Sequence, residues 1–131
     1  MQSKLKILFI DDHNGLREGM IFLLKNKNPS FEISGVSNVE EGIELLSRDK
    51  DFSLVILDLN LDGENSLEKI PAIKKANPKV SVLVYTMYNS EHQVANAVRC
   101  DIQGFITKES AVEELEQAIV AISKGNTYFN N

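Results

Sequence analysis

The chain alternates between short apolar runs and segments whose apolar residues fall at helical spacing. The clearest run is Leu54–Leu57, in which every residue is apolar until the chain reaches Asp58. Such a run is typical of a strand that is buried on both faces of a parallel sheet. The other strand candidates are segments 5–10, 31–36, 80–85 and 104–107. Strands that alternate with helices in this way predict an α/β fold, a doubly wound five-stranded parallel sheet with helices on both faces.

The segments between these runs carry helix start and stop signals. Three of them open with the spacing of a capping box, at Ser37–Glu40, Ser90–Gln93 and Ser110–Glu113. Pro71 lies within the third helical segment, so that helix either begins late, with Pro71 in its first turn, or is kinked. Gly125 is a typical helix stop. We therefore expect one domain over residues 1–125 and the start of a C-terminal linker over residues 126–131.

Length, composition and charge restrict the class of protein. With 131 residues, 43% of them hydrophobic and 25% charged, the chain has the size and composition of one globular domain. A net charge of −5 argues against direct contact with a nucleic-acid backbone, which requires clustered Lys and Arg. The lone Cys100 excludes an internal disulfide. No apolar run approaches the ~20 residues of a membrane span and no signal peptide is recognisable, so we expect a cytoplasmic protein without membrane contact.

Polar side chains follow the predicted strands at their carboxyl ends. These side chains are Asp11 and Asp12, Asp58, Thr86 and Lys108. Because parallel strands of a doubly wound sheet end at the same edge, we expect these side chains to form one cluster. Adjacent carboxylates repel one another, and a hard divalent cation such as Mg²⁺ relieves that repulsion. A lysine and a hydroxyl beside them suit a phosphoryl dianion, so the set indicates phosphoryl transfer with Asp58 as the nucleophile.

In their sequence context these residues resemble the motifs of the receiver domain of two-component response regulators, which has the CheY-like, flavodoxin-like (βα)5 fold. The matching motifs are the Asp11-Asp12 pair after ILFI, Asp58 in VILDLNL, Thr86 in VLVYTM and Lys108 in GFITK. The resemblance implies that Asp58 accepts a phosphoryl group from a sensor histidine kinase or a phosphotransfer protein. It also implies that Asp12 and Asp58 bind Mg²⁺ directly, whereas Asp11 helps through a water molecule.

The resemblance assigns further roles around the phosphoryl group. It implies that Asn60 lends its backbone carbonyl to the metal, that Lys108 pairs with the phosphoryl oxygens and that Thr86 hydrogen-bonds one of them. Phe105 stands at the aromatic switch position of the family, where the ring turns inward when Thr86 moves toward the phosphate. The implied chemistry is self-phosphorylation from a donor and slow autodephosphorylation. We therefore expect a signalling domain and not an enzyme in the ordinary sense.

Two further stretches are similar to receivers of the NarL/FixJ type. They are GFITKES, with Glu109 where proline is frequent, and the ending AISKGNTYF. This similarity implies transcription regulation through a helix-turn-helix domain that is absent from this chain, which alone would contact DNA, and a possible homodimer on activation. A stand-alone receiver that acts through protein–protein contacts is the alternative. Loop 59–66 departs from the family, since Leu61-Asp62 replaces a frequent Met-Pro and Ser66 a frequent glycine, so its course is the least predictable.

The same residues allow other interpretations. The sequence DLNLDG fits the first half of an EF-hand loop, with Asp58, Asn60 and Asp62 as calcium ligands, but the closing position is a lysine and the preceding segment is strand-like. A phosphatase with Asp58 as its nucleophile would carry that residue after its first strand. A receiver-shaped module that is never phosphorylated would not need the complete acidic and lysine set. His13 and His92 are candidate phosphate carriers or metal ligands, although a lone histidine in a loop or on a helix more often faces solvent.

Overall fold

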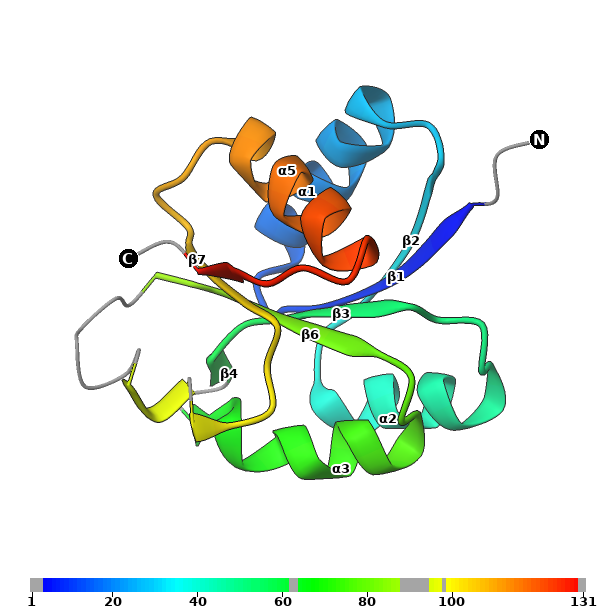
Figure 1. The fold of residues 1–131 in the computed structure, drawn as a ribbon, viewed down its shortest axis with the longest axis vertical. Helices are drawn as coiled ribbons and strands as arrows, with labels where there is room; N and C mark the ends of the chain where they lie inside the picture. Colours follow the sequence, from blue (N-terminus) through cyan, green and yellow to red (C-terminus); the bar gives the residue numbers. More distant parts are fainter. Residues whose placement is uncertain (1–3, 62–63, 88–94, 98, 130–131) are drawn as a thin grey trace.

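A six-stranded parallel sheet runs through the centre of the molecule and separates two layers of helices (Figure 1). The computed structural model describes residues 4–61, 64–87, 95–97 and 99–129. The strands lie in the order β2-β1-β3-β6-β7-β8, and all neighbouring strands are parallel. Their bounds are Leu5–Ile10 (β1), Phe31–Val36 (β2), Leu54–Leu57 (β3), Ser81–Thr86 (β6), Gly104–Thr107 (β7) and Tyr128–Phe129 (β8). The predicted doubly wound parallel sheet is confirmed, with a short sixth strand added at one edge.

The central strands are mostly apolar because helices cover both of their faces. All residues of β3 and β7 are buried, whereas β2, at the other edge of the sheet, has exposed residues between buried ones. The register pairs Ile10 with Val36 of β2 on one side and with Leu57 of β3 on the other. β1, β2 and β3 therefore end level with one another, and the residues that follow them meet at one edge of the sheet.

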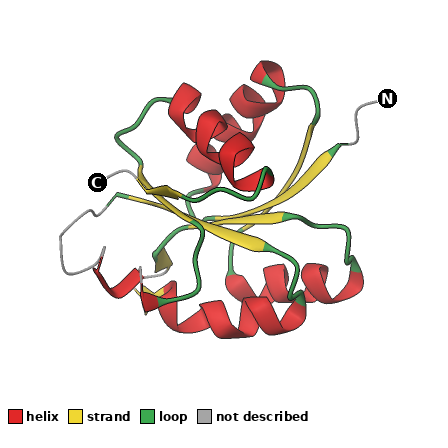
Figure 2. Cartoon of the chain, viewed as in Figure 1, coloured by secondary structure: helices red, strands yellow, loops and turns green. Residues whose placement is uncertain are grey.

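Helices cover both faces of the sheet (Figures 1 and 2). One layer holds α1 (Asn14–Lys27) and α5 (Val112–Ser123), and the other holds α2 (Val39–Arg48) and α3 (Ile70–Ala76). Successive strand residues point to opposite layers: Phe9 belongs to the core with α1 and α5, and Ile10 to the core with α2 and α3. Residues 95–97 and 99 are also helical. Among the described residues, no helix has the length and apolar character that crossing a membrane requires.

α3 begins late, which is one of the two alternatives predicted from the position of Pro71. A short 3₁₀ helix (Ser66–Lys69) precedes it, and the Asn65 side chain caps that helix by accepting the Leu67 N–H at 3.0 Å. Pro71 lies in the first turn of α3. At that position the missing N–H of proline leaves no intrahelical hydrogen bond unmade, so the helix continues without a kink.

The capping box predicted at Ser37 and Glu40 is wrong by one residue. The N-cap of α2 is Asn38, whose Oδ1 accepts the Glu41 N–H at 2.9 Å. Its Nδ2 donates in return to Glu41 Oε1 at 3.1 Å. Asn is as favourable as Ser at an N-cap, so the helix could begin after either residue. The start at Asn38 places Val39 on the buried face of α2.

The capping box predicted at Ser110 and Glu113 is also wrong. α5 begins at Val112, and its N-cap, Ala111, makes no side-chain hydrogen bond. The Ser110 N–H instead donates to Thr107 O at 3.1 Å, in the turn that leaves β7. This turn fixes Ser110 ahead of the helix. The third predicted box, at Ser90–Gln93, lies outside the described residues.

Gly125 ends the last helix as predicted. Its φ of 92° lies in the left-handed region that glycine adopts at little cost. The Gly125 N–H donates to Ile122 O at 3.0 Å, and the Asn126 N–H donates to Ala121 O at 3.0 Å. These two bonds form a Schellman motif, which satisfies the last carbonyls of α5 and returns the chain toward the sheet.

The returning segment forms β8 beside β7. Tyr128 pairs in register with Gly104, and its N–H donates to Gln103 O at 3.0 Å. A Cβ atom at Gly104 would lie 2.9 Å from Tyr128 O, so the close approach of the two strands requires glycine there. Tyr128–Phe129 thus adds a strand to the sheet, and the domain boundary predicted after residue 125 stays a prediction.

Candidate functional site

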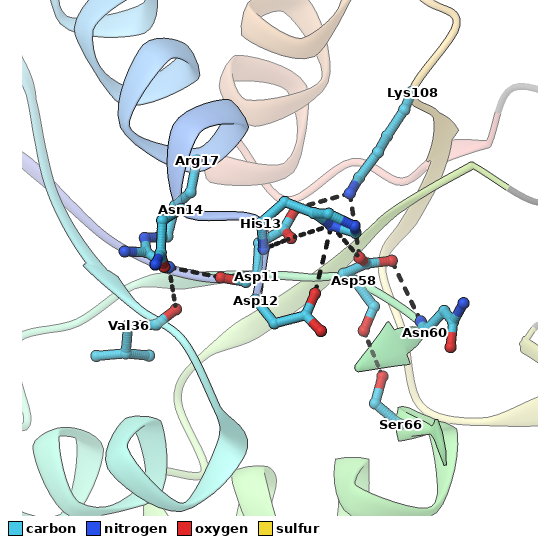
Figure 3. A network of polar contacts seen from close by, with 10 residues as sticks. All are labelled: Asp11, Asp12, His13, Asn14, Arg17, Val36, Asp58, Asn60, Ser66 and Lys108. Carbon is cyan, nitrogen blue, oxygen red and sulfur yellow. Dashed lines mark hydrogen bonds and ion pairs between the residues drawn. The ribbon is translucent and has the colours of Figure 1, made fainter. Parts of the chain in front are cut away.

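Asp58 follows the last residue of β3 and is almost completely buried, with 2% of its surface exposed. Its N–H donates to Ile10 O at 3.1 Å, which extends the pairing of β1 and β3 by one residue. Its Oδ1 accepts the Asn60 N–H at 3.2 Å, and its carbonyl accepts the Ser66 hydroxyl at 2.5 Å (Figure 3). These bonds fix the carboxylate at the edge of the sheet.

Lys108 connects the ends of separate strands. It follows β7, its N–H donates to Thr86 O at 2.7 Å, and only 2% of its side chain is exposed. The ammonium donates to Asp11 Oδ2 at 2.7 Å and to Asp58 Oδ2 at 3.1 Å (Figure 3). A buried ammonium that bridges two buried carboxylates compensates part of their charge, and each hydrogen bond is strengthened by that charge.

The Asp11-Asp12 pair lies in the loop between β1 and α1. Asp11 is fully buried, and its N–H donates to Val36 O at 3.1 Å. Its carbonyl accepts a hydrogen bond from Arg17 Nη1 at 2.6 Å, and the same nitrogen donates to Asn14 Oδ1 at 2.9 Å. The first turn of α1 therefore holds this loop in place. Asp12 is more open, with 22% of its side chain exposed.

The carboxylates at this edge form a set that suits a divalent cation. Asp11, Asp12, His13 and Asp58 each offer one ligand atom, and these four atoms lie within 4.8 Å of one another. When the three carboxylates are ionised, the single positive charge of Lys108 leaves the cluster with a charge of about −2. Carboxylate oxygens are the ligands that hard cations prefer. The charge and the donor atoms therefore both fit one Mg²⁺ ion.

The environment of Asp58 disfavours its ionised form. Burial raises the pKa of the Asp58 carboxyl above its usual range, and the negative charge of Asp11 acts in the same direction. The Lys108 ammonium and the hydrogen bond from the Asn60 N–H lower this pKa, but they do not cancel the effect of burial. Because the ionised form of Asp58 is stabilised by the Lys108 ammonium, a metal cation bound beside the carboxylate should stabilise that form further.

The remaining predicted site residues lie around this centre. Thr86 is the last residue of β6 and is fully buried. Asn60 meets Asp58 through its backbone N–H. Phe105 is fully buried in β7, where it pairs in register with Val84 and belongs to the core with α2 and α3. The structure thus brings Asp11, Asp12, Asp58 and Lys108 into one cluster, with Thr86 and Asn60 next to it and Phe105 within the core.

Sequence reasoning missed three contributors to the site. Ser66 was noted only as a departure from the family, yet its hydroxyl bonds the Asp58 carbonyl. Arg17 gave no signal, because its contact with the Asp11 carbonyl depends on how α1 leaves the loop. His13 was expected to face solvent, and 61% of its side chain does, but its Nδ1 points at the carboxylates. The sequence signal that could have placed His13 at the site is its position next to Asp12.

The EF-hand interpretation does not fit the structure around Asp58. An EF-hand loop follows a helix, whereas the segment before Asp58 is the strand β3. The chain beyond it forms a small antiparallel hairpin of β4 (Asn60–Leu61) and β5 (Glu64–Asn65). Asp62, the third proposed calcium ligand, lies outside the described residues.

Fold and site together are those of a signalling domain built on a doubly wound sheet, and comparison with known proteins identifies the family. The family described as the response regulator receiver domain matches residues 7–120, and the chain belongs to that family. It is the receiver domain of a two-component response regulator, and its relatives are of the NarL and LuxR kind. The resemblance inferred from the strand-end motifs is confirmed.

Three relatives show the extent of the similarity. The nitrate/nitrite response regulator protein NarL of Escherichia coli K12 is 32% identical over 124 residues, which cover 95% of this chain and 57% of NarL. The transcriptional regulatory protein ComA of Bacillus subtilis is 34% identical over 124 residues, with 92% and 56% covered. A LuxR-family response regulator from Aurantimonas has a crystal structure that is 28% identical, covers 96% of this chain and 89% of its own, and superimposes with a TM-score of 0.86. The chain thus spans just over half the length of the two curated relatives.

Proposed function

We propose that this receiver is a phosphorylation-dependent switch in which Asp58 is the phosphoacceptor. The observation that carries the proposal is the double contact of the Lys108 ammonium, 2.7 Å from Asp11 Oδ2 and 3.1 Å from Asp58 Oδ2. This contact gathers a nucleophile, an acidic partner and a cation at the edge where four strands end. Phosphoryl transfer needs such positioned charges more than it needs covalent chemistry from the protein.

The transfer step follows from the placement of Asp58. One of its carboxylate oxygens attacks the phosphorus of a phosphohistidine on the donor protein, and the new P–O bond forms as the P–N bond breaks, with its electron pair left on the imidazole. The Asn60 N–H and the Lys108 ammonium hold the carboxylate in place. After transfer, the ammonium pairs with a phosphoryl oxygen, and the Thr86 hydroxyl donates to another.

The acidic residues would hold Mg²⁺ for this step. Asp12, Asp58 and the Asn60 backbone carbonyl are proposed as direct ligands, and Asp11 as a ligand through water. The cluster charge of about −2 and the 4.8 Å limit on the ligand-atom separations support the carboxylate part of this assignment. When bound, Mg²⁺ neutralises charge on the carboxylates and the phosphoryl oxygens. Slow hydrolysis of the aspartyl phosphate would reset the domain, which is self-modification and not turnover of a separate substrate.

Phosphorylation would then shift the population between two conformations. Thr86 and Phe105 lie on the adjacent strands β6 and β7, two strand positions apart, since Thr86 pairs with Thr107. A movement of Thr86 toward the phosphoryl group would leave space beside β7 into which the Phe105 ring could turn, which is the proposed switch.

The proposed partners are a sensor histidine kinase or phosphotransfer protein and a DNA-binding output domain. The names of the curated relatives, a transcriptional regulatory protein among them, support an output in transcription. A homodimer that forms on activation is part of the same proposal. The acidic receiver would contact DNA only through such a domain, in the cytoplasm. A stand-alone receiver that acts through protein contacts is the alternative. The coding sequence after Asn131 distinguishes the two, since a helix-turn-helix there supports the first and a stop codon the second.

A beryllofluoride titration tests the proposed function. With Mg²⁺, beryllofluoride should bind at Asp58 and shift the NMR resonances of the Phe105 ring. Asp58→Asn should abolish the shift, while Asp51→Asn, at an exposed aspartate that precedes β3, should leave it intact. Unchanged Phe105 resonances in the wild-type protein would overturn the phosphoacceptor assignment.

A further inference from the structure

His13 turns its ring toward the acidic cluster and not toward its own helix. It occupies the N-cap position of α1, yet its side chain makes no capping hydrogen bond. Its Nδ1 lies 3.0 Å from Asp11 Oδ1, 3.3 Å from Asp12 Oδ1 and 3.9 Å from Asp58 Oδ2 (Figure 3). One ring nitrogen therefore faces oxygen atoms of three different carboxylates.

These distances lie within the range of separations between the ligands of one six-coordinate cation. With metal–ligand bonds of about 2.1 Å, neighbouring ligand atoms in an octahedron are about 3.0 Å apart and opposite ones about 4.2 Å. The three distances from His13 Nδ1 fall between 3.0 and 3.9 Å. The contact with Asp11 Oδ1 is also a hydrogen bond of the ring, whereas the contacts with Asp12 and Asp58 are ion-pair distances alone. The ring nitrogen thus lies close enough to the Asp12 and Asp58 oxygens to share one cation with them.

The hydrogen bonds of the cluster also leave room for a ligand other than Asp11. Both Asp11 oxygens already accept hydrogen bonds: Oδ1 from the backbone N–H of His13 at 2.9 Å, and Oδ2 from Lys108 at 2.7 Å. Asp11 is also fully buried behind its loop. His13, in contrast, has 61% of its side chain exposed.

We propose that His13 Nδ1 is a nitrogen ligand of the cation held at this site, and that the site therefore favours divalent transition cations over Mg²⁺ more strongly than an all-oxygen site does. Imidazole suits borderline cations of the first transition row, whereas Mg²⁺ prefers oxygen and keeps its waters. The inference rests on the proposed function only in that the same carboxylates bind a cation.

The test measures cation binding by the 131-residue chain. Isothermal titration with CoCl₂ and with MgCl₂ gives the ratio of the two affinities for wild type, His13→Ala and His13→Gln. Loss of the imidazole should weaken Co²⁺ binding by roughly 10-fold or more and Mg²⁺ binding by less than about 3-fold. With Mn²⁺ as the probe, pulsed EPR should show modulation from a directly bound ¹⁴N in the wild type and not in the variants. Equal urea midpoints in EDTA establish that the variants fold normally.

Each outcome separates this inference from the proposed function. If wild type binds the cations but shows no ¹⁴N modulation, and the Co²⁺-to-Mg²⁺ ratio is the same in all three proteins, His13 is not a ligand and the metal site stands. If both cations bind more tightly to His13→Ala, the ring competes with the cation and the inference is overturned. If neither cation binds wild type, or if Asp12→Asn binds as well as wild type, the proposed metal site itself fails.

Discussion

The buried ammonium of Lys108 makes the sharpest stability prediction, which is tested by Lys108→Met. The substitution keeps most of the side-chain volume but leaves Asp11 and Asp58 buried without their cation. Breaking a fully buried ion pair costs about 3–5 kcal/mol. Here the cluster opens on one side through Asp12, whose side chain is 22% exposed, so water screens part of the charge. We expect a loss of about 2–3 kcal/mol at pH 7.5 without divalent cations.

The pH dependence of this loss follows from the pKa of Asp58. Burial already raises that pKa, and Lys108 is the main group that lowers it, so the variant should have a still higher Asp58 pKa. A carboxyl whose pKa is higher in the folded state than in the unfolded state favours folding at low pH and loses that contribution as the pH rises through the folded pKa. The difference between variant and wild type should therefore be smaller at pH 5 than at pH 7.5.

Urea unfolding followed by circular dichroism measures both effects. With a denaturant slope of about 2 kcal/mol per molar, the loss corresponds to a midpoint lowered by roughly 1–1.5 M. Lys69→Met is the matched control, because its side chain is 44% exposed and its ammonium lies 3.8 Å from Glu40 Oε1, a pair expected to contribute under ~1 kcal/mol. Mg²⁺ at 100 times its Kd should return about 2.7 kcal/mol to a protein that binds it only when folded. Equal midpoints for the two lysine variants, or a larger loss at pH 5, would refute this reasoning.

Three further substitutions test other features by the same unfolding measurement. Asp58→Asn should raise the stability of the cation-free protein at pH 7.5 by an amount on the order of 1 kcal/mol. This gain should disappear at low pH, where the carboxyl is neutral in both the folded and the unfolded state. A loss of stability at pH 7.5 would contradict the raised pKa of Asp58. Gly104→Ala should destabilise by about 1–3 kcal/mol because its Cβ would lie 2.7 Å from Leu83 Cδ1, while Gly19→Ala, which meets nothing within 4 Å, should be neutral or stabilising. Asn38→Ala should cost about 1 kcal/mol through the lost cap of α2, and no change would mean that water replaces it.

The sheet and its polar edge could be predicted from the sequence because each depends on a local pattern with one physical cause. Leu54–Leu57 is apolar at every position because both of its faces are buried, and parallel strands must end at a common edge. Asp11, Asp58 and Lys108 could therefore be placed together before their contacts were known.

The parts that escaped prediction depend on choices between nearly equal alternatives or on distant packing. Ser37 and Asn38 are comparable N-caps, and only the burial of Val39 decides between them. The direction of the His13 ring and the bond from Ser66 to the Asp58 carbonyl arise from the course of two loops. β8 forms because the turn at Gly125 directs the chain back toward β7. A strand of two residues is too short to have a recognisable sequence pattern.

The pairing of β8 with β7 also bears on self-association. A strand at the edge of a sheet presents unpaired N–H and C=O groups to which a strand of another molecule can bind. β8 occupies these groups opposite Gly104 and Phe105, and it is itself too short to offer a long edge in turn. At the opposite edge, β2 carries the exposed, charged Glu32. Both edge strands therefore disfavour pairing with a strand of another molecule. β8 does so because it is short, and β2 because it carries an exposed charge.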